Sequence, residues 1–125
     1  MRYRRMPIEE ESPEQLGYGR IRRNLAESSV SDAPLADLGV DLGGLVLQYG
    51  DHLGLPELRE AIAADAAGAV ADDFIVTPGA VAALFIIHTS LLEPGDHIVV
   101  ARPNYATNVE TPRAIGADGT YLDLV

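Results

Sequence analysis

Two short segments place residues suited to binding a flat, anionic ligand directly after apolar runs. Thr77-Pro78-Gly79-Ala80-Val81 follows Phe74-Ile75-Val76, and Arg102-Pro103-Asn104-Tyr105 follows residues 97–101. An apolar triplet with two β-branched residues, a Pro-Gly break and an alanine-led apolar series are typical of a strand, a tight turn and a helix. The first N–H groups of such a helix lack intrahelical partners and its dipole favours negative charge, so Gly79, Ala80 and Val81 are candidate phosphate ligands.

Tyr105 stands where an aromatic ring could stack on the same ligand, because ligands of open α/β sheets bind beyond the carboxyl ends of the strands. An ordinary half-buried tyrosine is an equally good interpretation of its spacing. Most strand–turn–helix corners also bind nothing, so from the residues alone both assignments stay open.

Other catalytic chemistries have little support in the sequence. There is no cysteine, and all nine Lys+Arg positions are arginine. Thiolate nucleophiles, thiolate metal sites and lysine chemistry are therefore excluded within these residues. His52, His88 and His97 fit no local metal motif, and we expect structural or solvent-facing roles for them. The acidic residues are scattered and form no pair typical of acid–base catalysis.

The charge distribution argues against nucleic-acid binding. The net charge is −10, although residues 1–23 hold six arginines against four glutamates. Arg2, Arg4 and Arg5 could hold a carboxylate, but a solvated arm is the better interpretation of this segment. Residues 74–92 are uncharged, yet Pro78-Gly79 interrupts them, so we expect a soluble cytoplasmic protein without a membrane span or secretory signal.

The positioning elements follow the order β-α-β-α-β, which is typical of a parallel sheet with helical crossovers. After a surface helix that begins at Pro56, we expect strands at 74–76, 97–101 and 120–125. The helix after Gly79 is apolar nearly all round and should be mostly buried. A further helix should cover much of 105–115, with Pro112 kinking or restarting it.

Several of these motifs together resemble the class I/II aminotransferases, which are pyridoxal-phosphate enzymes of fold type I. The resemblance covers roughly residues 40 to 125 and rests on motifs in the family's order and spacing. They are Tyr49, Gly54-Leu55-Pro56-Glu57-Leu58-Arg59-Glu60-Ala61-Ile62, Val76-Thr77-Pro78-Gly79-Ala80, Leu92-Glu93-Pro94-Gly95-Asp96 and Pro103-Asn104-Tyr105.

The resemblance implies an α/β fold, namely part of a large cofactor-binding domain (42–125) after an irregular N-terminal arm and substrate-side segment (1–41). It implies pyridoxal phosphate as cofactor, with Gly79, Ala80 and Val81 on its phosphate and Tyr105 on its ring. Tyr49 would reach the phosphate across a homodimer interface, and Asn108 would lie near the cofactor. Residues 24–29 resemble the family's substrate-side segment.

The Schiff-base lysine that this family requires is absent, so we predict an N-terminal fragment that is inactive alone. The complete enzyme would transfer an amino group between an amino acid and a 2-oxo acid. Lyases and decarboxylases of the same fold remain alternatives. A further alternative is a non-catalytic module that holds phosphate ligands or pairs with a complete subunit.

Overall fold

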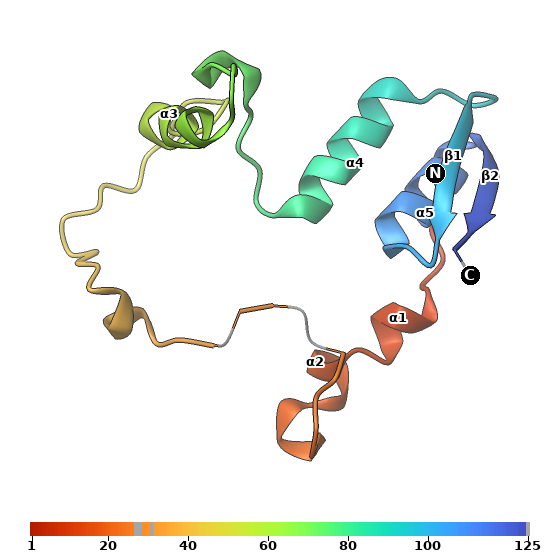
Figure 1. Cartoon of the computed structure of the whole chain (residues 1–125), viewed down its shortest axis with the longest axis horizontal. Coiled ribbons are helices and arrows are strands. Elements are labelled where there is room, and N and C mark those ends of the chain that lie inside the picture. The colour runs from red at the N-terminus through yellow and green to blue at the C-terminus, as the bar shows by residue number, and fades with distance from the viewer. Residues whose placement is uncertain (27–28, 31, 125) are drawn as a thin grey trace. The chain divides into compact units, whose positions relative to one another are not determined.

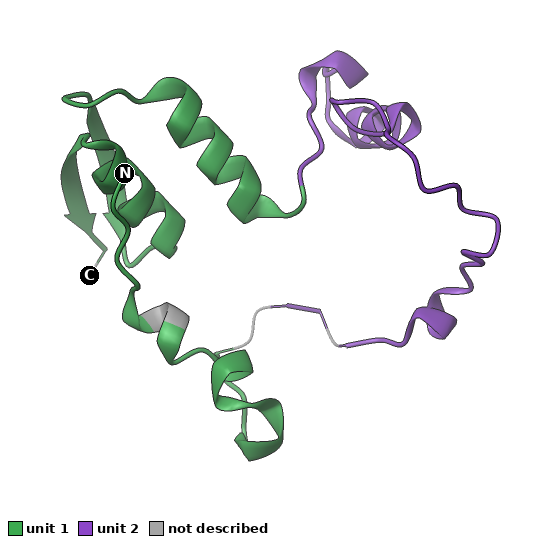
Figure 2. Ribbon diagram, turned by 180° about the vertical axis from the view of Figure 1, so that it is seen from behind, with its two compact units in different colours: residues 1–27, 78–125 green, residues 28–77 purple. Residues whose placement is uncertain are grey.

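The computed structural model describes residues 1–26, 29–30 and 32–124, the side chains of residues 8 and 9 excepted. The chain forms two compact units, one of residues 1–27 with 78–125 and the other of residues 28–77 (Figure 2). The first unit carries most of the regular structure.

A parallel strand pair joined by a helix forms the centre of the first unit (Figure 1). Strand β1 (His97–Arg102) pairs with β2 (Asp118–Asp123), with Val100 opposite Tyr121, and helix α5 (Ala106–Ile115) connects them. This arrangement confirms the predicted strand–helix–strand crossover. The second strand begins two residues earlier than predicted, at Asp118 instead of Thr120.

Local sequence explains where α5 begins and ends. Tyr105 precedes it with extended backbone angles (φ −64°, ψ 142°), and Gly116 ends it in the left-handed region (φ 101°). Pro112 lies inside the helix, which nevertheless remains a single element from Ala106 to Ile115. The helix therefore does not restart at Pro112, because the proline removes only one N–H donor, whereas the alternative of a kink there stays a prediction.

Helix α4 (Ala80–Leu91) confirms the predicted helix, but the prediction that it is mostly buried is wrong. His88 is its only buried residue, whereas Ile87 and Leu91 are 49% and 73% exposed. A helix that is apolar on every side needs neighbours on every side. Among the described elements α4 packs against α5, so the rest of its surface stays open.

The strand predicted at 74–76 is also absent. Phe74 has extended backbone angles (φ −118°, ψ 140°), but among the described residues the parallel sheet contains only β1 and β2. The Val76 N–H instead donates to the Leu53 carbonyl at 2.8 Å. Because a strand exists only where a neighbouring strand accepts its hydrogen bonds, the apolar triplet alone did not determine it.

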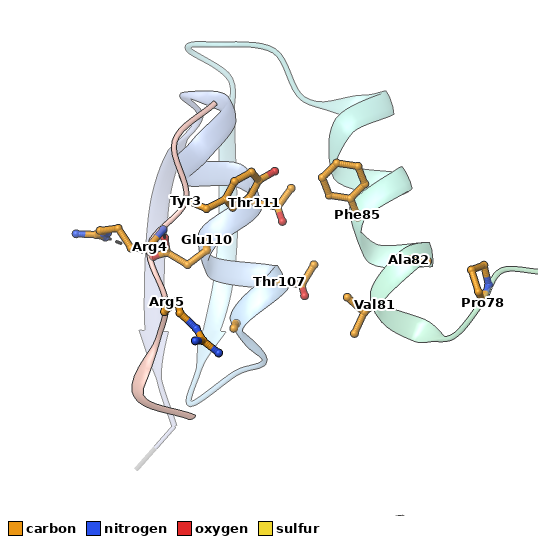
Figure 3. Close-up of a pocket in the computed structure, with 11 residues that line it drawn as sticks. Tyr3, Arg4, Arg5, Pro78, Val81, Ala82, Phe85, Thr107, Glu110 and Thr111 are labelled. Atoms are coloured by element: carbon orange, nitrogen blue, oxygen red, sulfur yellow. Dashed lines mark hydrogen bonds and ion pairs between the residues drawn. The ribbon is translucent and has the colours of Figure 1, made fainter. Parts of the chain in front are cut away.

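The N-terminal arm is more ordered than its composition indicated. It contains α1 (Pro7–Glu10), α2 (Pro13–Leu16) and the 3₁₀ turn η1 (Tyr18–Arg20). Residues 1–5, which we call the strap, lie along α5 (Figure 3). All five strap residues are exposed, and the strap also contacts α5 through the ion pair of Arg4 with Glu110.

The second unit contains η2 (Leu35–Leu38), α3 (Pro56–Asp65) and η3 (Ala71–Asp73). The buried Arg59 ties α3 to η3, because its Nη1 donates to the Ala71 carbonyl at 3.1 Å and lies 3.3 Å from Oδ1 of Asp72. The Arg59 side chain in the family-like motif thus has a structural role in this unit.

Buried apolar side chains are few in the described part of the chain, where only Val100, Ala106 and Pro112 qualify. A two-stranded sheet with α4 and α5 cannot enclose more, although the sequence has ample apolar residues. No helix among the described residues is long and apolar enough to cross a membrane.

Candidate functional site

A cavity of about 700 Å³ opens between the strap, α4 and α5 (Figure 3). The first turns of both helices contribute to its walls. The wall formed by the strap consists of Tyr3, Arg4 and Arg5. The wall on the α4 side consists of Pro78, Val81, Ala82 and Phe85, and the wall on the α5 side consists of Ala106, Thr107, Glu110 and Thr111.

The start of α4 has the geometry that an anion needs. Gly79 caps the helix at φ 88°, ψ 163°, a backbone conformation that side-chain-bearing residues rarely adopt. A Cβ added at Gly79 would meet no atom within 4 Å, so open space borders the helix start. The first helical bond runs from the Ala83 N–H to the Gly79 carbonyl, so the N–H groups of Ala80 and Val81 have no acceptor within the helix.

A hydrogen-bonded turn holds Tyr105 at the end of β1. The side chain of Asn104 donates to the Ala101 carbonyl at 3.0 Å, and its Oδ1 accepts the Tyr105 N–H at 2.7 Å. The Asn108 amide donates to the same Oδ1 at 2.8 Å. Asn104 is therefore the centre of this turn, although the sequence predictions did not single it out. Its position between the end of a strand and the N-cap of a helix was the feature of the sequence that could have indicated this role.

Among the described residues that the sequence predicted for the site, Val81 is the one that lines the cavity. Val81 and Ala106, the residue after Tyr105, line the same cavity, and Gly79 and Ala80 immediately precede Val81. The Tyr105 side chain is half-exposed, and Asn108 lies one turn into α5. Tyr49 belongs to the other unit, where its side chain is fully exposed, so its predicted meeting with the phosphate stays a prediction.

Glu110 is the acidic residue in the cavity wall, and its carboxylate accepts several hydrogen bonds. Its carboxylate accepts the Arg4 N–H at 3.2 Å, the Arg4 Nη2 at 3.4 Å and the Arg113 Nε at 2.9 Å. The hydrogen bond from Arg113, followed by those from Arg4, holds the pKa of Glu110 below its ordinary value despite burial. A carboxylate held ionised by two arginines anchors the strap and is poorly suited to donate a proton.

The histidines lie in three different environments. His88 is buried with Nδ1 unpaired within the described structure, and burial lowers its pKa. The Nε2 of His97 lies 2.9 Å from the Thr120 Oγ1 across the strand pair, whereas His52 is exposed in the other unit. Within residues 1–26, 29–30 and 32–124, no three His, Asp or Glu side chains cluster to hold a metal ion.

Comparison with known proteins identifies what this chain is similar to. The sequence model of the family "Aminotransferase class I and II" matches residues 20–120. An aspartate/prephenate aminotransferase from Thermus thermophilus is 34% identical over 74 residues, which cover 55% of this chain and 19% of the relative.

Solved structures agree with the family match. A PLP-dependent aminotransferase from Streptococcus suis superposes with a TM-score of 0.70 at 27% identity, over 78% of this chain and 29% of that chain. The PLP-dependent cyclase OrfR superposes with a TM-score of 0.60 at 34% identity, over 73% of this chain and 23% of that chain. The matched part of the chain thus spans less than one third of the length of each of these relatives.

Proposed function

The chain belongs to the class I and II aminotransferase family, and we propose that it forms part of the cofactor-binding domain of a pyridoxal-phosphate-dependent aminotransferase. In this proposal residues 42–125 are the partial large domain, and residues 1–41 are the arm with the substrate-side segment. The complete enzyme would move an amino group between an amino acid and a 2-oxo acid.

The observation that carries this proposal is the open start of α4 next to the cavity. Gly79 holds its left-handed conformation with no atom within 4 Å of an added Cβ, so an anionic group has room to approach the backbone. The N–H groups of Ala80 and Val81 follow directly, in the turn where the helix dipole favours negative charge. These residues fit a phosphate.

The other proposed ligands follow from the same region. The half-exposed Tyr105 ring is available for stacking, and the Asn104 turn fixes its backbone. Asn108 holds the turn through Asn104, so it would act on the cofactor through Tyr105. Tyr49 would contribute from a second subunit of a homodimer. Pyridoxal phosphate, when bound, supplies an electron sink for the substrate's α-carbon.

The 125 residues contain no lysine, so the amine that anchors the cofactor would come from residues outside them. We therefore expect no turnover by this chain alone. After incubation with pyridoxal phosphate and borohydride, mass mapping should find modification only at the α-amino group of Met1. Any internal adduct would contradict this part of the proposal.

Ala80→Pro tests the phosphate site by removing one N–H group. Ala80 is the first residue of α4, where proline is well tolerated, and the extended ψ of Gly79 (163°) suits a residue before proline. The matched control is Ala80→Gly, which keeps the N–H group. Binding of pyridoxal phosphate and of pyridoxal, which lacks the phosphate, would be measured by equilibrium titration of the 125-residue chain.

We expect pyridoxal phosphate to bind more tightly than pyridoxal. Ala80→Pro should weaken binding of only the phosphate form, by about tenfold to a hundredfold, the value of one hydrogen bond to a charged group. Equal binding of the two compounds by the wild-type chain, or equal losses in the proline and glycine variants, would overturn the phosphate assignment.

The reaction type has one competitor with its own support. The similarity to the PLP-dependent cyclase OrfR shows that this fold also accompanies another reaction. Amino transfer is favoured because the family model and the Thermus relative are both aminotransferases. An amino-acceptor assay of the full-length enzyme with a 2-oxo acid would decide between them.

A further inference from the structure

We propose that the cavity between the strap, α4 and α5 binds a small amphipathic carboxylate, with its carboxylate on Arg5 and its apolar body against Val81 and Phe85. The cavity borders the proposed phosphate site, which uses the backbone of Val81, whereas the ligand proposed here contacts the side chains of the cavity walls. Figure 3 shows Val81 and Phe85 on the side of α4 that faces Thr107 and Thr111 of α5.

Arg5 supplies the cavity's available positive charge. Arg4 is paired with Glu110 at 3.4 Å, and the Arg113 side chain bonds both Glu110 and the Arg2 carbonyl. Arg5 lines the cavity without an ion pair or side-chain hydrogen bond to any described residue. Its planar guanidinium can bind a carboxylate through two parallel hydrogen bonds.

The acid in the cavity wall does not repel such a ligand. Glu110 is 7% exposed, and both of its carboxylate oxygens already accept hydrogen bonds from Arg4 or Arg113. Its charge is offset by two guanidinium groups. The strap itself contains three arginines and no acid, although the whole chain is acidic.

The remaining walls suit an apolar body with one polar contact. Val81, Ala82 and Phe85 form the α4 side, and Phe85 is 40% exposed. Opposite them, Thr107 and Thr111 contribute hydroxyl groups to the α5 side, and Thr111 is only 2% exposed. A cavity of about 700 Å³ with apolar walls and a few convergent polar groups has the character of a small-molecule site.

Binding of naphthylpropionate to the 125-residue chain tests this proposal. Calorimetry would compare it with naphthylpropionamide, which lacks the charge, and with propionate, which lacks the aromatic body. Arg5→Gln removes the proposed carboxylate ligand. Arg2→Gln is the matched control, since it removes a charge from the same strap but Arg2 does not line the cavity. Ala82→Phe fills the cavity from the α4 side.

We expect saturable binding of naphthylpropionate that weakens about tenfold in Arg5→Gln and stays within about twofold in Arg2→Gln. The amide should bind the wild-type chain and Arg5→Gln equally weakly, and propionate should not bind measurably. Ala82→Phe should abolish binding of both aromatic compounds.

Three results would overturn the site. The first is no saturable binding by the wild-type chain. The second is an equal loss in Arg5→Gln and Arg2→Gln, which would indicate only long-range attraction. The third is unchanged binding in Ala82→Phe, which would place the ligand elsewhere on the chain.

Discussion

Arg4 and Glu110, 106 residues apart in the sequence, are joined by two hydrogen bonds. The Arg4 backbone N–H and its Nη2 both donate to the Glu110 carboxylate, at 3.2 and 3.4 Å. Arg113 binds the same carboxylate from the neighbouring turn of α5 and also reaches the Arg2 carbonyl at 2.9 Å. The strap is thus held on α5 by one acid and its two arginines.

Glu110→Gln should release the strap, because the amide lacks the charge and one of the acceptor oxygens that bind the two arginines. We expect amide hydrogen exchange at Arg4 to accelerate about tenfold, as the loss of a charge-assisted hydrogen bond predicts. Glu60→Gln is the control, since Glu60 is exposed and makes no side-chain hydrogen bond or ion pair with the described residues. Equal exchange at Arg4 in both variants would contradict the anchoring role.

Acid should have the same effect on the wild-type chain. The pKa of Glu110 in the folded chain is lower than the ordinary value of 4.5, so its contribution to stability is complete above that value. The contribution is lost as the pH falls through the lower, folded-state pKa. Arg4 exchange should therefore rise on acidification in the wild-type chain, after correction for intrinsic exchange, and show no such step in Glu110→Gln.

His88 should make the free energy of unfolding depend on pH in a different range. Burial lowers its folded-state pKa below 6.5, so the unfolded chain takes up a proton first as the pH falls. The contribution of the neutral His88 to the free energy of unfolding should be complete above pH 6.5 and should be lost as the pH falls toward the lower, folded-state pKa. Denaturant titrations between about pH 7.5 and pH 5.5 would measure this decline around the ordinary histidine pKa.

His88→Leu should flatten this pH dependence without destabilising the chain at neutral pH, because it removes an unpaired buried Nδ1. His52→Gln changes an exposed histidine and should leave the decline intact. A decline that persists unchanged in His88→Leu would assign it to another group.

Gly54→Ala should destabilise the second unit, since Gly54 has φ 103° and a Cβ there would lie 2.4 Å from the Val76 Cβ. The left-handed backbone and the clash together should lower the free energy of unfolding by about 2 kcal/mol or more. Gly50→Ala is a matched control, because an added Cβ meets no atom within 4 Å there. Thermal melts would compare the variants, and equal melting temperatures would contradict the predicted clash.

Tyr105→Ala in the full-length enzyme should weaken binding of pyridoxal phosphate by about 1 kcal/mol, the magnitude of an aromatic pair. Tyr105→Phe retains the ring and should keep most of the affinity. Cofactor titration of the apoenzyme would measure both. Unchanged affinity in Tyr105→Ala would count against stacking.

The sequence by itself determined the local elements and the family. Pro56 at the start of α3, Gly79 before α4 and Gly116 after α5 act through their own backbone preferences, so spacing was enough to predict these helices. The apolar run of β1 and the order of the short motifs were likewise readable directly. The predicted site residues Gly79, Ala80, Val81 and Tyr105 came from these local patterns and from the resemblance.

Only the tertiary structure decided which distant groups meet. Residues 74–76 have the composition of a strand, but among the described residues no strand pairs with them. Helix α4 is apolar on all sides, but among the described elements it packs against α5. The pairing of Arg4 with Glu110 and the central position of Asn104 depend on side chains meeting across elements. Such pairings leave no periodic trace in the sequence, because many arginines and asparagines are locally equivalent and only the folded arrangement selects their partners.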